Sequence, residues 1–269
     1  MSDLLTRPRA EEIRAGAAFA PVSPVDVAVE GLAKRYGAAE PVFENVSFRL
    51  ARGEAAALVG ANGTGKSTLL RCLMGLVSPS GGRAEILGTD IAAARPAALR
   101  LLRAQIGLVS QKHNLVPRLS VLSNVIHGLM GSGSGPRYWT QALAPEPARE
   151  AATAALEKVG LADLARRRAD RLSGGQSQRV AIARALVARP KFLIADEPCA
   201  SLDPQAGEDV MALFFNLVRE EGVTVLFTSH NIEHALQYGD RILGLAGGRL
   251  QLDATAASLD ADTLRTLYA

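Results

Sequence analysis

Residues 60–68, GANGTGKST, combine glycines with polar side chains in a spacing that suits phosphate chemistry, and they fit the pattern G-x-x-x-x-G-K-S/T. They follow the apolar run EAAALV and precede the helical pattern STLLRCLMGLV, which is the context that this motif requires. Glycines let successive backbone N–H groups turn towards one anion, and the N-terminus of a helix adds partial positive charge. The stretch therefore predicts a loop that binds the phosphates of a nucleoside triphosphate.

This loop also contains groups for a magnesium–nucleotide complex. We expect Lys66 to reach the β- and γ-phosphates and Ser67 to ligate Mg²⁺. The candidate ATP-binding residues of the loop are Gly60, Ala61, Asn62, Gly63, Thr64, Gly65, Lys66, Ser67 and Thr68.

Two adjacent carboxylates, Asp196 and Glu197, follow a second apolar run, FLIA at residues 192–195. Asp196 and Glu197 would then lie at the C-terminal edge of a buried strand, where open α/β sheets bind their ligands. A metal accounts for one carboxylate, so we expect Asp196 to position Mg²⁺ and Glu197 to act as the general base on an attacking water. A purely structural role explains this pair of side chains poorly.

Three more side chains follow predicted strands. Gln111 follows IGLVS and can contact Mg²⁺ or the water, and His230 ends VTVLFTSH, where it can hydrogen-bond the γ-phosphate and hold the water in place. Tyr36 follows the first predicted strand and is placed to stack on adenine. Each residue alone would also suit a structural or surface role, so the hypothesis depends on the strand ends being aligned.

The elements that must position these residues alternate along the chain. Strand and helix patterns follow each other from residue 54 to residue 238, which predicts a mainly parallel sheet with helices on both faces. VDVAVEGL and VSFRL alternate apolar and polar residues and predict half-buried strands, and RILGLAGGRLQLD predicts a hairpin.

The domain organisation follows from shifts in composition. Residues about 112–188 predict a mainly helical subdomain inserted in the core, ending in a helix over 172–188. Residues 1–24 carry mixed charge and three prolines, so we expect a loose leader before a domain of residues 25–269.

Composition narrows the class of protein. The 269 residues carry a formal charge of +3 and are 48% hydrophobic, which is ordinary for a globular protein, and we expect no nucleic-acid partner. The two cysteines, Cys72 and Cys199, lie far apart without metal-ligand spacing, and we expect both to be small buried residues. No apolar run is long enough for a membrane span and no signal-peptide pattern opens the chain, so we expect a cytosolic chain.

The sequence resembles the ATP-binding subunits of ABC transporters, through Tyr36, residues 60–68, Gln111, LSGGQ at 172–176, FLIADE at 192–197, SLD at 201–203 and His230. This resemblance implies an α/β P-loop NTPase of ABC type, with a mainly parallel core sheet, an antiparallel β subdomain and an inserted helical subdomain. It also implies that Ser173, Gly174, Gly175 and Gln176 contact the ATP held by a second copy of the chain. Asp203 would organise the interface of that head-to-tail dimer, which encloses two ATP molecules.

Within this family, QKHNLVPRLSVLSNVIHGLMG and the segments after it resemble the phosphonate-import ATPases. Ser177 and Asn231 depart from the usual glutamines of that group without removing a catalytic group. The resemblance implies that transmembrane permease subunits are direct partners and that a periplasmic or extracellular substrate-binding protein is an indirect partner. It also implies a peripheral position at the cytoplasmic face of the inner membrane.

Several other functions remain open from the sequence. The cargo could be phosphite, an amino acid or another small solute, and the system could be an exporter. A soluble ABC protein acting on DNA or ribosomes and a scaffold that no longer hydrolyses ATP are more remote alternatives. One phosphate loop and a short insertion disfavour the former, and Glu197 and His230 disfavour the latter.

Overall fold

The computed structural model describes residues 24–131 and 136–265, so the predicted leader lies outside the described residues except for Pro24. Its larger sheet has six strands in the order β10-β9-β3-β8-β7-β6. The strands are β3 (Ala55–Val59), β6 (Ile106–Ser110), β7 (Phe192–Asp196), β8 (Thr224–Thr228), β9 (Arg241–Ala246) and β10 (Arg249–Thr255). All neighbours run parallel except β9 and β10, which form the predicted hairpin.

The central strands are apolar on both faces because helices or a second sheet cover each face. All five residues of β3 and all five of β8 are buried. Ala55, Ala57 and Val59 belong to a core with the helices on one side, whereas Ala56 and Leu58 belong to a core on the other side. This alternation follows from the two-residue period of a strand.

Strand register places the functional ends side by side. Thr228 at the end of β8 pairs with Asp196 at the end of β7, and Asp196 pairs in turn with Ser110 at the end of β6. On the other side of β8, Thr228 pairs with Leu58 of β3, just before the phosphate loop. The C-terminal ends of these parallel strands therefore form one edge, where such sheets bind ligands.

A second, antiparallel sheet has the order β2-β1-β4-β5. Its strands are β1 (Val25–Lys34), β2 (Phe43–Ala51), β4 (Gly81–Ile86) and β5 (Thr89–Asp90). Buried and more exposed residues alternate along most of β2, as the sequence predicts for a half-buried strand. β4 and β5 were not predicted, because GGRAEI and TD are too short and too polar to give a strand signal.

The helices cover the larger sheet and extend beyond it. They are α1 (Lys66–Leu73), α2 (Pro96–Arg103), α3 (Val121–Ile126), α4 (Glu146–Lys158), α5 (Gly174–Leu186), α6 (Pro204–Glu220), α7 (Ile232–Tyr238) and α8 (Ala261–Arg265). Short 3₁₀ turns occupy His127–Leu129, Pro136–Tyr138, Ala162–Leu164, Ala169–Arg171 and Ala256–Ser258.

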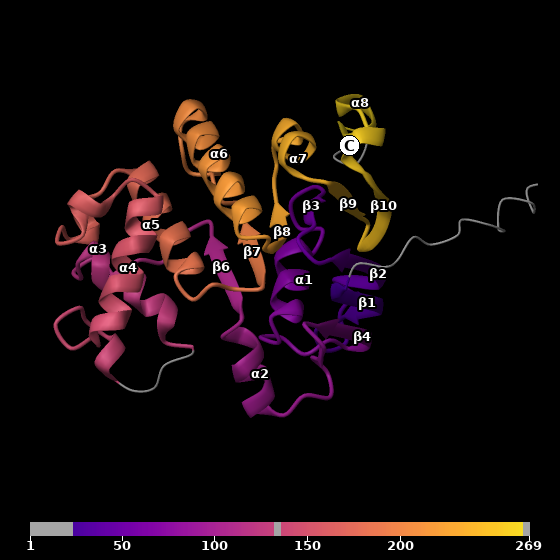
Figure 1. Cartoon of the computed structure of the whole chain (residues 1–269). Helices are drawn as coiled ribbons and strands as arrows, with labels where there is room; N and C mark the ends of the chain where they lie inside the picture. Colours follow the sequence, from indigo (N-terminus) through magenta and orange to yellow (C-terminus); the bar gives the residue numbers. More distant parts are fainter. Residues whose placement is uncertain (1–23, 132–135, 266–269) are drawn as a thin grey trace, which may run out of the picture.

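Helices α3, α4 and α5 lie together at one end of the molecule, and the antiparallel sheet lies at the other end (Figure 1). α4 buries Ala148, Ala152 and Ala155, whose small side chains belong to the same core as the apolar residues of α3 and α5. The structure thus has helices over much of the range where the sequence predicts a helical insertion, and the predicted α/β architecture with an antiparallel β sheet is confirmed.

Candidate nucleotide-binding site

The phosphate loop joins β3 to α1 in a conformation that only glycines adopt easily. Gly60, Gly63 and Gly65 have φ angles of 146°, 81° and 100°. A Cβ atom on Gly60 would lie 2.1 Å from the carbonyl oxygen of Leu245, so a larger residue cannot fit there. Because α1 starts at Lys66, the loop leads directly into the N-terminus of a helix, as the motif predicts.

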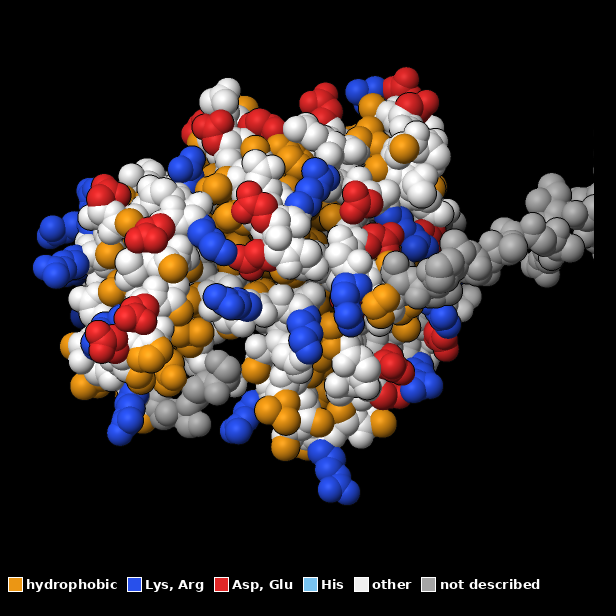
Figure 2. All heavy atoms as spheres, in the orientation of Figure 1, with side chains coloured by type: hydrophobic (Ala, Val, Ile, Leu, Met, Phe, Trp, Pro, Cys, Tyr) orange, Lys and Arg blue, Asp and Glu red, His pale blue; other side chains and the backbone are white. Residues whose placement is uncertain are grey.

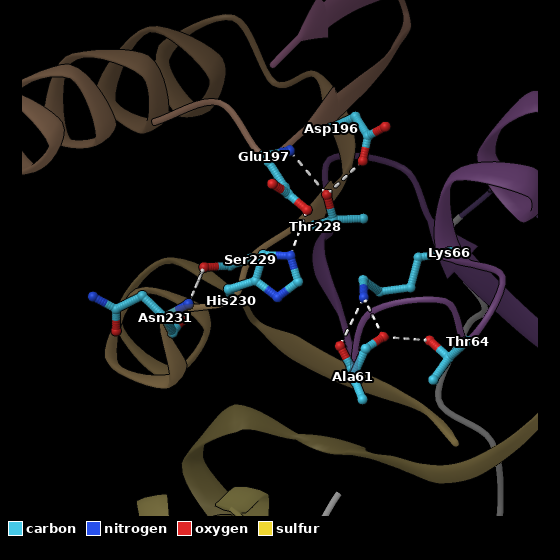
Figure 3. Close-up of polar contacts among 10 residues, drawn as sticks. Ala61, Thr64, Lys66, Asp196, Glu197, Thr228, Ser229, His230 and Asn231 are labelled. Atoms are coloured by element: carbon cyan, nitrogen blue, oxygen red, sulfur yellow. Dashed lines mark hydrogen bonds and ion pairs between the residues drawn. The ribbon is translucent and has the colours of Figure 1, made fainter. Parts of the chain in front are cut away.

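The ammonium group of Lys66 lies over this loop. Its Nζ donates hydrogen bonds to the carbonyl oxygens of Gly60 and Ala61 at 2.7 and 2.9 Å, and the residue is only 6% exposed (Figure 3). Burial lowers the pKa of Lys66, whereas the negative charges of Glu197 and Asp196 raise it in part. In the described part of the chain Lys66 has no ion-pair partner, so its charge is available to an anion.

The other loop residues differ in how open their side chains are to solvent. Asn62, Gly63 and Ser67 are exposed, whereas Ala61, Thr64, Gly65 and Thr68 are half-buried. The hydroxyl of Thr64 donates to the carbonyl oxygen of Ala61 at 3.0 Å, which ties the loop to itself. Ser67 is therefore accessible to a metal ion, as its predicted role requires.

The two carboxylates lie across from this loop, at the end of β7. Glu197 has a left-handed backbone with φ 50°, a conformation that costs about 1–3 kcal/mol for a residue other than glycine and that clusters at functional sites. Its Oε1 lies 2.5 Å from Nε2 of His230. The structure thus brings together Lys66, Asp196, Glu197 and His230, which the sequence predicts as one site (Figure 3).

One residue of this cluster was missed from the sequence. Thr228 is fully buried at the end of β8, and its hydroxyl contacts both Asp196 and the backbone of Glu197. The only sequence signal was a hydroxyl group at the end of the apolar run VTVLFT, and that signal does not show which carboxylate it meets.

Gln111 directly follows Ser110, which pairs with Asp196, so this residue lies near the site. Its side chain is exposed and has no hydrogen-bond partner among the described residues, and its contact with Mg²⁺ or water stays a prediction. Arg184 of α5 donates to the carbonyl oxygens of His113 and Asn114 at 2.5 and 2.7 Å. Burial lowers the pKa of Arg184. This arginine, which the sequence analysis missed, therefore links the chain after Gln111 to α5.

Tyr36 lies two residues beyond β1 and is 50% exposed. The ammonium of Lys34 lies 4.6 Å from the centre of its ring. The exposed ring is accessible to a stacking partner, and stacking on adenine stays a prediction.

The helix that follows the signature turn begins within the predicted range of 172–188. α5 starts at Gly174, because Ser173 and Gln176 form a reciprocal cap at its N-terminus. The Ser173 hydroxyl accepts from the Gln176 N–H at 3.3 Å, and the Gln176 side-chain oxygen accepts from the Ser173 N–H at 3.1 Å. Both glycines therefore lie in the first turn of the helix.

This turn packs against the segment that contains Asp203. A Cβ atom on Gly174 would lie 3.1 Å from Leu202, and one on Gly175 would lie 4.0 Å from Ala206. The Asp203 carboxylate caps α6 by accepting from the Ala206 N–H at 3.0 Å. No hydrogen bond or ion pair between described residues joins the signature turn to the phosphate loop. Helix α5, which follows the signature turn, lies apart from α1, which follows the phosphate loop (Figure 1).

Gln178 lies one turn further along α5, on the face of Gly174 and Gly175. It is fully buried, and neither polar atom of its amide has a hydrogen-bond partner in the described protein. We expect Gln178→Leu to raise the free energy of unfolding by about 1–3 kcal/mol, since it removes the cost of burying an unpaired amide. Urea unfolding followed by circular dichroism measures this change, and a loss of stability would show that the amide is paired.

The residues of the site fit ATP and Mg²⁺. A buried ammonium without an ion-pair partner among the described residues and a glycine-rich loop at a helix N-terminus suit a triphosphate. No group of three His, Cys, Asp or Glu side chains in the described residues could hold a metal by itself. Mg²⁺ does not need one, because it is commonly bound by one or two carboxylates together with substrate phosphates and water. Asp196 and Ser67 suit that mode of binding.

The fold and the site thus define a nucleoside-triphosphate-binding α/β protein with a glycine-rich phosphate loop. Residues 43–200 match the ABC transporter family model, from the start of β2 to just after the paired carboxylates. The chain therefore belongs to the ABC transporter family.

Known proteins of the family resemble the chain over nearly its whole length. The phosphonates import ATP-binding protein of Frankia casuarinae is 48% identical over 87% of this chain and 92% of its own. The phosphate-import ATP-binding protein of Mycolicibacterium smegmatis is 46% identical over 92% of this chain and 94% of its own. The dimeric, post-hydrolysis structure of the ATP-binding cassette MJ0796 with ADP and Pi has a TM-score of 0.74 and 33% identity, covering 86% of this chain and 98% of that one.

Proposed function

We propose that the chain is the ATP-hydrolysing subunit of an ABC importer for phosphonates. The observation that supports phosphonate as the cargo is the 48% identity to a phosphonates import ATP-binding protein, over 92% of that protein. The hydrolytic activity is supported by the cluster of Lys66, Asp196, Glu197 and His230 at one sheet edge.

In the proposed reaction, water attacks the γ-phosphorus of ATP, the bond from that phosphorus to the oxygen bridging it to the β-phosphate breaks, and ADP leaves together with phosphate. Lys66 neutralises charge that develops on the phosphate oxygens, and the Glu197 carboxylate takes the proton of the water. His230 contacts Glu197 and orients its carboxylate towards that water. Asp196 and Ser67 would hold Mg²⁺, which would supply further neutralisation of the phosphate charge. Rate enhancement comes from positioning and electrostatics, without a covalent intermediate.

A second copy of the chain completes each site in this proposal. Ser173, Gly174, Gly175 and Gln176 face the ATP of the partner copy, and Asp203 organises the contact between the two. The dimeric form of the MJ0796 cassette supports this arrangement, as does the lack of any bond from the signature turn to its own phosphate loop among the described residues. Residues 25–269 would then form one ABC ATPase domain, with the helical subdomain at about 112–188.

The proposed membrane partners are transmembrane permease subunits, and a periplasmic or extracellular substrate-binding protein delivers cargo to them. A docking surface for the permease subunits is supported by exposed apolar side chains on α2 and beside α4. These are Leu101, Trp139 and Leu143, which are 64%, 61% and 60% exposed. Figure 2 shows hydrophobic side chains gathered over α2 and over the lower end of the helical group. None of the helices in the described ranges is long and apolar enough to cross a bilayer. We place the chain peripherally at the cytoplasmic face of the inner membrane.

A second candidate cargo is inorganic phosphate. The relative from Mycolicibacterium smegmatis is named a phosphate-import protein and is 46% identical, almost as similar as the phosphonate-import relative. Phosphonate and phosphate share a tetrahedral oxyanion, and this subunit binds neither of them in the proposed mechanism. The cargo must therefore be tested through transport.

We predict that a strain lacking this chain loses growth on a phosphonate as the sole phosphorus source and keeps growth on phosphate. The wild-type chain should restore growth and Glu197→Gln should not, because transport needs hydrolysis. Loss of growth only at low phosphate would favour the phosphate importer. Unchanged growth on both sources would contradict both cargoes.

A further inference from the structure

Thr228 occupies a central position between the two carboxylates of the site. It is the last residue of β8, it is fully buried, and it pairs in register with Asp196 of β7. Its Oγ1 donates a hydrogen bond to Oδ1 of Asp196 at 2.8 Å and accepts one from the backbone N–H of Glu197 at 2.9 Å (Figure 3). A single hydroxyl thus connects two residues that have different predicted roles.

The directions of these bonds are fixed by the chemistry of the groups. A hydroxyl has one proton to donate, and the backbone N–H of Glu197 can only donate, so the Thr228 proton points to Asp196. This bond occupies Oδ1 of Asp196, while Oδ2 has no hydrogen-bond partner in the described part of the chain. The second oxygen therefore remains available to a cation.

The bond to Glu197 acts on a strained part of the chain. Glu197 has a left-handed backbone with φ 50°, and such a conformation persists only where the surroundings hold it. The Thr228 hydroxyl, on the neighbouring strand, accepts a hydrogen bond from the N–H of this residue. The direction in which the Glu197 side chain leaves the backbone thus depends on Thr228.

We infer that Thr228 is a positioning residue for ATP hydrolysis, whose hydroxyl orients Asp196 towards the metal and holds Glu197 in the conformation that faces the water. This inference rests on the proposed function, since it concerns the same site. Loss of the hydroxyl is expected to weaken metal binding and turnover while ATP still binds through the phosphate loop.

The same strand offers a matched control. Thr224, at the other end of β8, is also fully buried. Its hydroxyl donates to Oδ2 of Asp26 at 2.6 Å and accepts from the N–H of Gly53 at 2.8 Å. Thr224 and Thr228 therefore make the same pair of bonds, to an aspartate and to a backbone N–H, but only Thr228 does so at the site.

The experiment compares Thr228→Val, Thr228→Ser and Thr224→Val in the full-length chain. The steady-state ATPase rate gives kcat and KM, and electron paramagnetic resonance of Mn²⁺ with the non-hydrolysable analogue AMPPNP gives the metal affinity without turnover. Urea unfolding measures the stability of each variant. Valine keeps the shape of threonine without its hydroxyl, and serine keeps the hydroxyl.

For Thr228→Val we expect kcat and Mn²⁺ affinity to fall by about 10–100-fold, as is typical when a partner of a metal ligand is removed. KM for ATP should change little, and Thr228→Ser should restore most of both losses. Thr224→Val should lose as much stability as Thr228→Val and keep wild-type kcat and Mn²⁺ affinity. If Thr228→Val does not fold, Thr228→Ala provides the same comparison.

Wild-type kcat and Mn²⁺ affinity in Thr228→Val would overturn the inference. Equal losses of activity in Thr224→Val would also overturn it, because the effect would then be one of stability. A wild-type chain that does not hydrolyse ATP would instead contradict the proposed function. The Mn²⁺ measurement would still decide in that case whether Thr228 orients Asp196.

Discussion

Replacement of Glu197 with glutamine is expected to lower kcat for ATP hydrolysis by about 10²–10⁴-fold, which is the usual contribution of a general base. Glutamine keeps the size of the side chain and cannot take a proton from water. The left-handed backbone and the bond from its N–H to Thr228 do not involve the carboxylate, so the variant should fold as the wild type does. ATP should still bind, because Lys66 and the phosphate loop are unchanged.

A consequence of this loss is a stable ATP-bound dimer, since in the proposed two-copy site an ATP that is not hydrolysed continues to join the two copies. Size-exclusion chromatography with light scattering should show a dimer for Glu197→Gln with MgATP and a monomer without nucleotide. Glu221→Gln is the control, because Glu221 pairs with Lys158 away from the site. Normal turnover in Glu197→Gln would show that another group serves as the base.

Replacement of Lys66 with methionine is expected to reduce ATP affinity by about 10²–10⁴-fold. Each hydrogen bond from a charged donor to a phosphate oxygen contributes about 1.5–3 kcal/mol. The free energy lost with two such bonds corresponds to the expected reduction in ATP affinity. Methionine has a similar length and apolar stem but no charge. The Lys66 ammonium is buried and donates to two carbonyl oxygens of its own loop, and no other lysine or arginine of the described residues bonds to these oxygens.

Fluorescence titration with a labelled ATP analogue measures this affinity. Lys158→Met is the matched control, since Lys158 pairs with Glu221 and is half exposed. It should bind ATP as the wild type does, whereas Lys66→Met should bind weakly even with excess Mg²⁺. If Lys66→Met kept wild-type affinity, the buried ammonium would have a structural role only.

The class of fold and the family could be predicted from the residue pattern alone. Short, mainly apolar runs predicted the buried strands β3, β7 and β8, because a strand that is covered on both faces is apolar along most of its length. The glycine pattern at residues 60–68 predicted the phosphate loop, since only glycine readily adopts the φ angles found at Gly60, Gly63 and Gly65. The resemblance to ABC ATP-binding subunits is confirmed by the family match. The roles of Tyr36, Gln111 and the signature residues stay predictions.

The contacts between the strand ends depend on the three-dimensional packing of the chain and could not be predicted from local patterns. The bonds of Thr228 to Asp196 and Glu197 join residues about thirty positions apart, and they depend on the register between β7 and β8. The bond between His230 and Glu197 and the link from Arg184 to His113 also join distant segments. Local patterns report burial and backbone conformation, which depend on neighbouring residues in the chain. They do not report which hydroxyl, carboxylate or guanidinium meets another, because that depends on how the packed strands and helices are aligned.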